Sequence, residues 1–470
     1  MDERRIASLV DRWAREHRME LVEDLKKLLS IPSVAEYDQD GYPMGPSCAK
    51  AVDFLIEAGR RYGIETENND YFCAVLNLPS KETAAQLGIL GHLDVVPPGD
   101  GWKQDAFQPF EQKGYIFGRG SIDNKGPIMM AVYVMRCIKE LDIPFRSGIT
   151  IIAGCDEEKE MRDVVHYLSR HSAPDFTLIC DGAWPVGIGE KGMLEAELLQ
   201  EVKEGNLIRL SGGRVSNQVP DCAEAVLADV DPDVLVAVQN QYQSLHAEEQ
   251  NNRIVLSYCG KAAHCSTPNH GDNAILQLIS ILLNSGLVRG DASVQLALLE
   301  KCFIDYNGTG LRIYHADALS GTTTCVPVSI ELKNGILRTG INVRYCVSQN
   351  GDILVNKLRK RCNQLGMELK MFFHEKPRLA DADDPVVKLL LQNCQKNLSR
   401  KCKPYVTGGG TYARRFPNSI PYGPVYLDAG LPKRYGQPHM ANEAVSIEQL
   451  LEGIKIYVLA LMKLDEYFSD

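Results

Sequence analysis

The order of hydrophobic and polar positions in the first part of the chain is typical of an α/β domain. Apolar runs at residues 88–96, 149–153 and 176–180 predict buried strands. Residues 128–141 and 161–170, which separate these runs, have apolar positions at helical spacing. Strands that alternate with helices in this way favour a mainly parallel sheet with helices on both faces. In such sheets, ligands bind beyond the carboxyl ends of the strands.

Helical spacing also marks both ends of the chain. It predicts helices at residues 8–29, which end before Ile31-Pro32, at residues 46–62 and at residues 447–464, and the α/β pattern of the first part resumes near residues 385–397. Between residues 194 and 378 the pattern changes to shorter alternating segments, such as 208–211, 254–258 and 341–345, with helices at 273–284 and 351–365.

This change of pattern indicates a second domain inserted into the first. A chain of 470 residues is also too long for one ordinary core. We therefore predict a catalytic α/β domain formed by residues 1–187 and 381–470. A large inserted α+β lid domain would span residues 188–380.

Composition excludes several classes of protein. A net charge of −10 at pH 7 argues against a nucleic-acid partner, which would require a clustered basic surface. The sequence contains no signal peptide and no apolar run of roughly 20 residues, so we expect a cytoplasmic protein without a membrane partner. The 14 cysteines include no C-x-x-C pair, and we expect reduced core residues rather than metal ligands.

Acidic residues follow the second and third predicted strands, at Asp156-Glu157-Glu158 and at Asp181. Adjacent carboxylates repel one another unless cations or protons compensate them. A solvated acidic turn is the commoner outcome for such a run. The position at strand ends favours a metal site instead.

Three further motifs could complete this site. His92 and Asp94 point the same way along a strand, so the carboxylate could orient a metal-bound imidazole; a polar pair at a strand end is an equal alternative. Asp123, in the glycine-rich segment 118–127, could bridge two cations or cap the following helix. His439 precedes the last helix, where a lone histidine is usually a surface residue. Oxygen and imidazole ligands suit Zn²⁺, Mn²⁺ or Co²⁺.

Together, these motifs resemble the zinc-dependent aminoacylase, carnosinase and succinyl-diaminopimelate desuccinylase family of metallopeptidases, and within it the PepV-type dipeptidases. The matching segments occur in the family's order. They are residues 91–97, 118–127, 156–158, 181 with 189–192, 260–268, 408–413 and 438–443.

The resemblance implies a zinc-peptidase-like fold that binds two divalent metal ions. Zinc is the expected metal, and manganese and cobalt are the alternatives. Asp123 and a water would bridge the two ions. One ion would also bind His92 and Asp181, and the other Glu158 and His439. Glu157 would act as the general base on the bridging water.

The resemblance also implies roles for residues around the metals. Asp94 would orient His92, and His264 from the inserted domain would stabilise the oxyanion. The implied substrate-binding residues are Asn217, Arg344, Gly409, Gly410 and Thr411. Asn217 would assist His264, and Arg344 would pair with the substrate carboxylate through its bidentate fork.

We therefore expect a dipeptidase that acts on small peptides. An N-acyl amino acid amidohydrolase of the same family is the alternative, and a non-catalytic metal-dependent binding protein is a remote one. The inserted domain is larger than a small dimerisation domain requires. Because PepV-type members with an enlarged lid are monomers, we expect a monomer.

Overall fold

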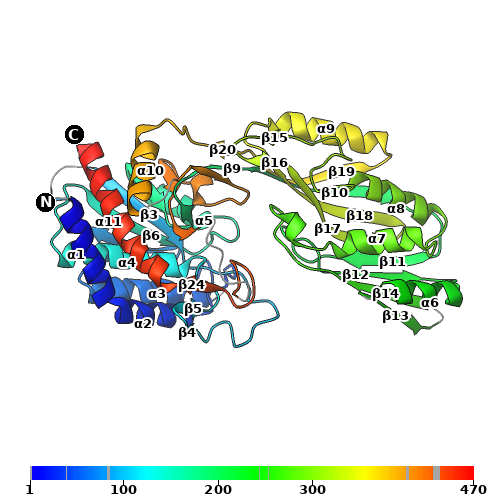
Figure 1. Ribbon diagram of the computed structural model, residues 1–470, viewed down its shortest axis with the longest axis horizontal. Helices are drawn as coiled ribbons and strands as arrows, with labels where there is room; N and C mark the ends of the chain where they lie inside the picture. The colour runs from blue at the N-terminus through cyan, green and yellow to red at the C-terminus, as the bar shows by residue number, and fades with distance from the viewer. Residues whose placement is uncertain are drawn as a thin grey trace. The chain divides into compact units, whose positions relative to one another are not determined.

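The computed structural model describes residues 3–38, 40–81, 85–242, 244–251, 253–398, 402–426 and 435–469. Contacts within the chain divide it into two compact units (Figure 1). The first unit comprises Met1–Ile188, Ala380–Tyr405 and Gly410–Asp470. The second comprises Gly189–Leu379 and Val406–Gly409.

A six-stranded sheet forms the centre of the first unit, in the order β1-β2-β6-β3-β7-β22. Strands β6, β3, β7 and β22 are parallel, whereas β1 and β2 pair antiparallel at one side. The strand bounds are Glu65–Asn69 (β1), Cys73–Leu78 (β2), Gln86–His92 (β3), Gly148–Gly154 (β6), Phe176–Ile179 (β7) and Ser419–Pro421 (β22). Every residue of β6 is buried, which explains its unbroken apolar run.

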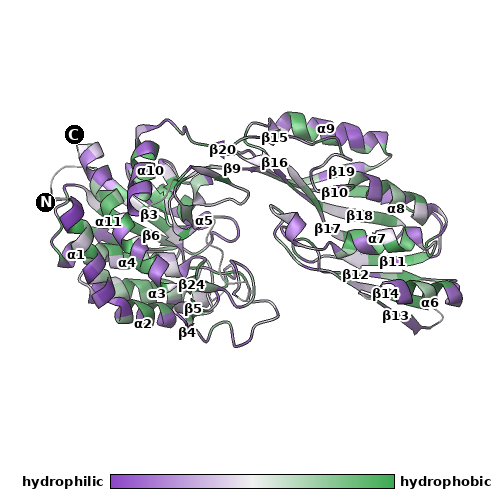
Figure 2. Ribbon diagram, viewed as in Figure 1, coloured by the Kyte–Doolittle hydropathy of each residue, from purple (hydrophilic) through white to green (hydrophobic). Residues whose placement is uncertain are grey.

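Helices cover this sheet on both faces. Helix α4 (Lys125–Glu140) connects β3 to β6, and α5 (Arg162–Arg170) connects β6 back past β3 to β7. The two crossovers run in opposite directions, so their right-handedness places the helices on opposite faces. Helices α1 (Glu3–Glu16) and α11 (Ile447–Ser469) pack with α4 (Figure 1). The buried residues of α11 are nearly all apolar, and hydrophobic and hydrophilic positions alternate along this helix (Figure 2).

Other helices and strands complete the first unit. These are α2 (Arg18–Leu29), α3 (Pro46–Arg61), β4 (Phe110–Gln112), β5 (Tyr115–Phe117), β8 (Gly182–Trp184), α10 (Pro385–Asn397), η2 (Tyr412–Arg414), β23 (Pro424–Tyr426) and β24 (Ala444–Ser446). Across the described part of the chain, no helix is both long and apolar enough to span a membrane.

The second unit contains an eight-stranded antiparallel sheet, in the order β13-β14-β12-β11-β17-β18-β10-β19. Residues of β10 alternate between buried and half-buried, as expected for a sheet with one covered face. The bounds are Gly192–Glu201 (β10), Leu207–Gly212 (β11), Cys222–Leu227 (β12), Leu245–Gln250 (β13), Arg253–Cys259 (β14), Thr324–Lys333 (β17), Ile336–Tyr345 (β18) and Glu368–Glu375 (β19).

Four helices pack on this sheet or on one another: α6 (Pro232–Gln241), α7 (Ala274–Asn284), α8 (Asp291–Cys302) and α9 (Gly351–Gln364). Their buried apolar side chains form one core with the sheet. The chain enters this unit through β9 (Gly187–Glu190) and leaves it through β20 (Arg378–Leu379), and these two strands pair antiparallel. Strand β21 (Tyr405–Thr407) lies beside β9.

Some local expectations differ from the structure. The helix expected at residues 8–29 is two helices, α1 and α2, that separate at His17. The strand expected to reach Val96 ends at His92, and helices α6 and α8 carry no pattern that we recognised. All 14 cysteines are described and are free thiols, and most are buried.

Candidate metal centre

The central sheet places the acidic motifs around one strand end. Strand β3 lies between β6 and β7, and all three are parallel. His92 is the last residue of β3, Asp156 to Glu158 follow β6, and Asp181 follows β7. Because the helices after β3 and β6 lie on opposite faces, this edge is the point where the strand order reverses, which is the usual place for ligands in open α/β sheets.

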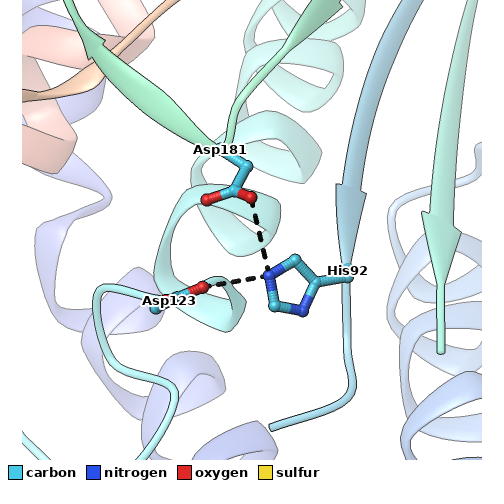
Figure 3. Close-up of side chains that lie close together, drawn as sticks. All are labelled: His92, Asp123 and Asp181. Carbon is cyan, nitrogen blue, oxygen red and sulfur yellow. Dashed lines mark hydrogen bonds and ion pairs between the residues drawn. The ribbon is translucent and has the colours of Figure 1, made fainter. Parts of the chain in front are cut away.

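Two carboxylates converge on the same nitrogen of His92. Its Nε2 atom lies 3.0 Å from Asp123 Oδ1 and 3.9 Å from Asp181 Oδ2 (Figure 3). Possible ligand atoms of the three residues lie within 4.8 Å of one another. We refer to His92, Asp123 and Asp181 as the first triad.

A second triad consists of Asp123, Glu158 and His439, whose ligand atoms also lie within 4.8 Å of one another. His439 Nε2 lies 3.2 Å from Asp123 Oδ2 and 2.9 Å from Glu158 Oε1. Asp123 is therefore shared, with one oxygen near each histidine. It is not the helix cap, because Asn124 occupies the N-cap position of α4.

Asp94 contacts the Nδ1 atom of His92, the ring nitrogen that the first triad does not use. His92 Nδ1 lies 2.9 Å from the Asp94 carbonyl oxygen and 3.3 Å from its Oδ1 atom. Strand alternation does not explain this contact, since β3 ends at His92 and Asp94 lies in the following loop. The Asp94 carboxylate also accepts hydrogen bonds from the backbone N–H groups of Glu157, at 3.2 Å, and Glu158, at 3.0 Å.

Glu157 lies in this turn, and its Oε1 atom is buried without a hydrogen-bond partner among the described residues. Burial, together with the negative charges of Asp181, Glu158 and Asp123, raises the pKa of Glu157 well above its ordinary value. A carboxylate with a raised pKa and an unused oxygen is suited to accept and release a proton.

The electrostatics of both triads fit cations. Burial and the Asp123 charge raise the pKa of Asp181 to about 7. Burial opposes protonation of His439, but the charges and hydrogen bonds of Glu158 and Asp123 raise its pKa to about 11. Both shifts show that this buried group of carboxylates favours nearby positive charge, which divalent cations would supply. The oxygen and imidazole donors suit zinc-like ions.

Asn124 also supports this centre, although sequence analysis did not assign it a role. Its Oδ1 atom accepts the backbone N–H of His92 at 3.2 Å, and its Nδ2 atom donates to the carbonyl oxygen of Cys180 at 3.0 Å. It therefore ties the end of β3 to the segment that carries Asp181. Its position next to Asp123 is the only sequence signal for this function.

Arg119 and Glu443 form a second unassigned contact, with Nη1 and Oε2 2.6 Å apart. Both side chains are buried. They lie in the segments that carry Asp123 and His439, and their place within these motifs was a signal that sequence reasoning did not interpret.

The model of peptidase family M20/M25/M40 matches residues 88–463, which include both triads. The chain belongs to this family. It is 30% identical over 475 residues to a Staphylococcus epidermidis protein named "Putative dipeptidase", covering 96% of this chain and 98% of that protein. "Putative dipeptidase YtjP" of Bacillus subtilis is 30% identical over 459 residues. The match covers 95% of this chain and 97% of that protein.

Solved structures with the same fold include human carnosine dipeptidase 1, with a TM-score of 0.62, 15% identity, and coverage of 98% of this chain and 99% of that chain. Aminoacylhistidine dipeptidase from Vibrio alginolyticus has a TM-score of 0.54, 12% identity, and coverage of 94% and 96%. The expected mixed α/β fold is confirmed. This M20 protein is a metallopeptidase, a hydrolase that acts on peptide bonds.

In the second unit of this M20 peptidase, several expected substrate-binding residues lie near one another. His264 Nδ1 lies 2.6 Å from Ser266 Oγ, and the Ser266 side chain packs against Gly408. Arg344 Nη1 lies 3.5 Å from the Gly408 carbonyl oxygen, and the Asn217 carbonyl oxygen accepts the N–H of Cys265 at 2.9 Å.

The glycine loop 408–411 lies where the chain passes from the second unit to the first. Gly409 belongs to the second unit, whereas Gly410 and Thr411 belong to the first. The Thr411 hydroxyl caps η2 by accepting the N–H of Ala413 at 3.2 Å. This capping contact gives the hydroxyl a structural function.

Proposed function

We propose that this M20 metallopeptidase is a dipeptidase with two metal ions that uses Glu157 as its general base. The observation that carries the proposal is the shared carboxylate of Asp123, which has one oxygen near His92 and the other near His439. The names of its relatives support the substrate class, since several of them are called dipeptidases.

The first triad would hold one divalent ion and the second triad the other. The donor set suits zinc, manganese or cobalt, and the family resemblance favours zinc among them. Two such ions would supply Lewis-acid chemistry, which lowers the pKa of an attacking water and stabilises the charge that develops on the substrate carbonyl oxygen. All five ligands lie in the first unit.

Glu157 would accept the proton from the attacking water and transfer it to the leaving amine. Its buried oxygen, which has no hydrogen-bond partner among the described residues, is available to accept the proton, and its raised pKa favours holding that proton until the amine leaves. Asp94 would keep His92 in one tautomer and hold the turn that carries Glu157.

We assign substrate binding to the second unit and the glycine loop. Arg344 would bind the terminal carboxylate, and its Nε atom is already oriented by Asn342 Oδ1 at 2.9 Å. His264, assisted by Asn217, would stabilise the oxyanion. Gly409, Gly410 and Thr411 would contact the substrate near its carboxylate.

A substrate panel tests this proposal. Purified protein is loaded with zinc, its metal content is measured, and the same sample is assayed on dipeptides and on N-acyl amino acids. Cleavage of dipeptides with two metal ions per chain is the expected result. Turnover of N-acyl amino acids alone would identify the amidohydrolase alternative, and fully loaded protein without any turnover would identify a binding protein.

We further propose that the active form is a cytoplasmic monomer. Light scattering on the active protein is expected to give the mass of one chain, 52.2 kDa. A mass of twice this value, with activity lost on dilution to single chains, would contradict the proposal.

A further inference from the structure

Arg119 and Glu443 form a buried ion pair between the two segments that supply the shared aspartate and the second histidine. The distance from Nη1 to Oε2 is 2.6 Å, and the side chains are 1% and 0% exposed. The two residues are 324 positions apart in the sequence. Neither belongs to a metal triad.

The Glu443 side of the pair organises the loop that carries Asp123. Its Oε1 atom accepts the backbone N–H groups of Ile122, at 3.0 Å, and Asp123, at 3.2 Å. Its Oε2 atom accepts the N–H of Gly120 at 3.2 Å. Gly120 has a φ of 83°, and a Cβ atom there would lie 2.7 Å from Val95, so this loop conformation requires glycine.

The Arg119 side reaches the segment of His439. Its guanidinium donates to the carbonyl oxygens of His439, at 3.3 Å, and Met440, at 3.4 Å. It also donates to the carbonyl oxygen of Pro98, in the loop after β3, at 3.1 Å. The guanidinium carbon lies 5.4 Å from the centroid of the Trp102 ring. The Arg119 side chain therefore contacts two segments: the loop that follows His92 and the segment that contains His439.

Fold stability alone does not explain such a pair. Desolvation of two charges offsets much of their attraction, and well-packed apolar residues often stabilise a protein equally well. The pair differs from an apolar contact because its hydrogen bonds fix backbone orientation, and here they fix the backbone of Asp123 and His439.

We propose that Arg119 and Glu443 are positioning residues that hold Asp123 and His439 in the arrangement that binds cations. The proposal rests on the two-metal centre proposed above. It predicts that loss of either partner weakens metal binding even where the fold persists.

The test compares zinc affinity among Arg119→Met, Glu443→Gln and the wild-type protein, by competition with a chromophoric chelator. Zinc affinity is expected to fall about 10- to 100-fold in both variants, the usual effect of losing a group that orients metal ligands. Wild-type zinc affinity in both folded variants would overturn the proposal.

Arg136→Met is the matched control. Arg136 is also buried and pairs with Glu20, at 2.9 Å, and Glu140, at 2.7 Å, in helices rather than in the metal segments. This variant is expected to lose thermal stability and to keep wild-type zinc affinity. An equal loss of zinc affinity in Arg136→Met would show a general effect of instability and would overturn the proposal.

Arg119→Lys keeps the test decisive if Arg119→Met does not fold. It retains the charge but loses the planar fork, so a smaller loss of zinc affinity is expected, and wild-type affinity would contradict the proposal. Failure of the proposed function is distinguishable, because it would appear as a wild-type protein that binds zinc but cleaves no dipeptide.

Discussion

Asp94 Oδ2 accepts a hydrogen bond from the backbone N–H of Glu158 at 3.0 Å. The same carboxylate lies 3.3 Å from His92 Nδ1 through its other oxygen. One buried side chain thus links a member of the first triad to the turn that carries a member of the second. A change at Asp94 should therefore affect both metal sites.

We expect Asp94→Asn to lower zinc affinity at both sites by about 10- to 100-fold. An amide places a donor beside either the imidazole or the N–H groups of the turn, so at least one contact is lost. Metal content after dialysis against chelators of graded strength measures the effect. Asp53→Asn, an exposed change on α3, is the control, and equal metal retention in both variants would contradict the expectation.

Glu157 and Glu158 are adjacent but should respond differently to the same substitution. Glu157→Gln is expected to keep both metal ions and to lose about 100- to 10,000-fold in kcat, since an amide cannot accept the proton. Glu158→Gln is expected to lose one metal ion. Metal analysis and dipeptide turnover on the same samples separate the two, and full activity in Glu157→Gln would refute its assignment as base.

Metal stoichiometry should distinguish the shared ligand from a single-site ligand. Asp123→Ala removes a member of both triads and is expected to weaken both sites. Asp181→Ala removes a member of the first triad only, so one ion should remain tightly bound. Isothermal titration with zinc resolves the two cases. Loss of both ions in Asp181→Ala would show that the triads are not independent.

Asp163, at the start of α5, should make stability depend on pH. Burial, and after it the charge of Asp94, raises the pKa of Asp163 to about 7 from 3.8. The folded state then binds a proton that the unfolded state has released. Stability from this group is therefore present below pH 4 and is lost as the pH rises to 7, by at most about 4 kcal/mol.

Thermal unfolding of metal-free protein between pH 4.5 and 8 measures this effect. The destabilising trend with rising pH should be smaller in Asp163→Asn, which has no proton to lose. Asp142→Asn, at a residue whose side chain is 92% exposed, is expected to follow the wild-type curve. Parallel curves for wild type and Asp163→Asn would contradict the assigned shift.

The main helices and strands could be predicted from the sequence because they are buried along most of their length. Strand β6 is buried at every position and α4 is buried along nearly its whole length, so both appear as continuous apolar patterns. The five expected metal ligands lie in two overlapping triads because three of the motifs follow neighbouring parallel strands.

Other features depend on long-range contacts that no local pattern contains. The contact between Asp94 and His92 follows from a turn after β3 rather than from strand alternation. The pairing of Arg119 with Glu443 joins residues 324 positions apart. Helix α8 has buried residues, but its apolar positions are too evenly spread around the helix to mark one face.

The paired strands β9 and β20 have a consequence for protein engineering. Glu190 and Arg378 are register partners, so the two ends of the second unit are about 5 Å apart. A linker of a few residues could close the gap if that segment were excised. Every proposed metal ligand would remain in the shortened chain, because all five lie outside Gly189–Leu379. The proposed metal centre could therefore be produced and studied without the segment that contains Asn217, His264 and Arg344.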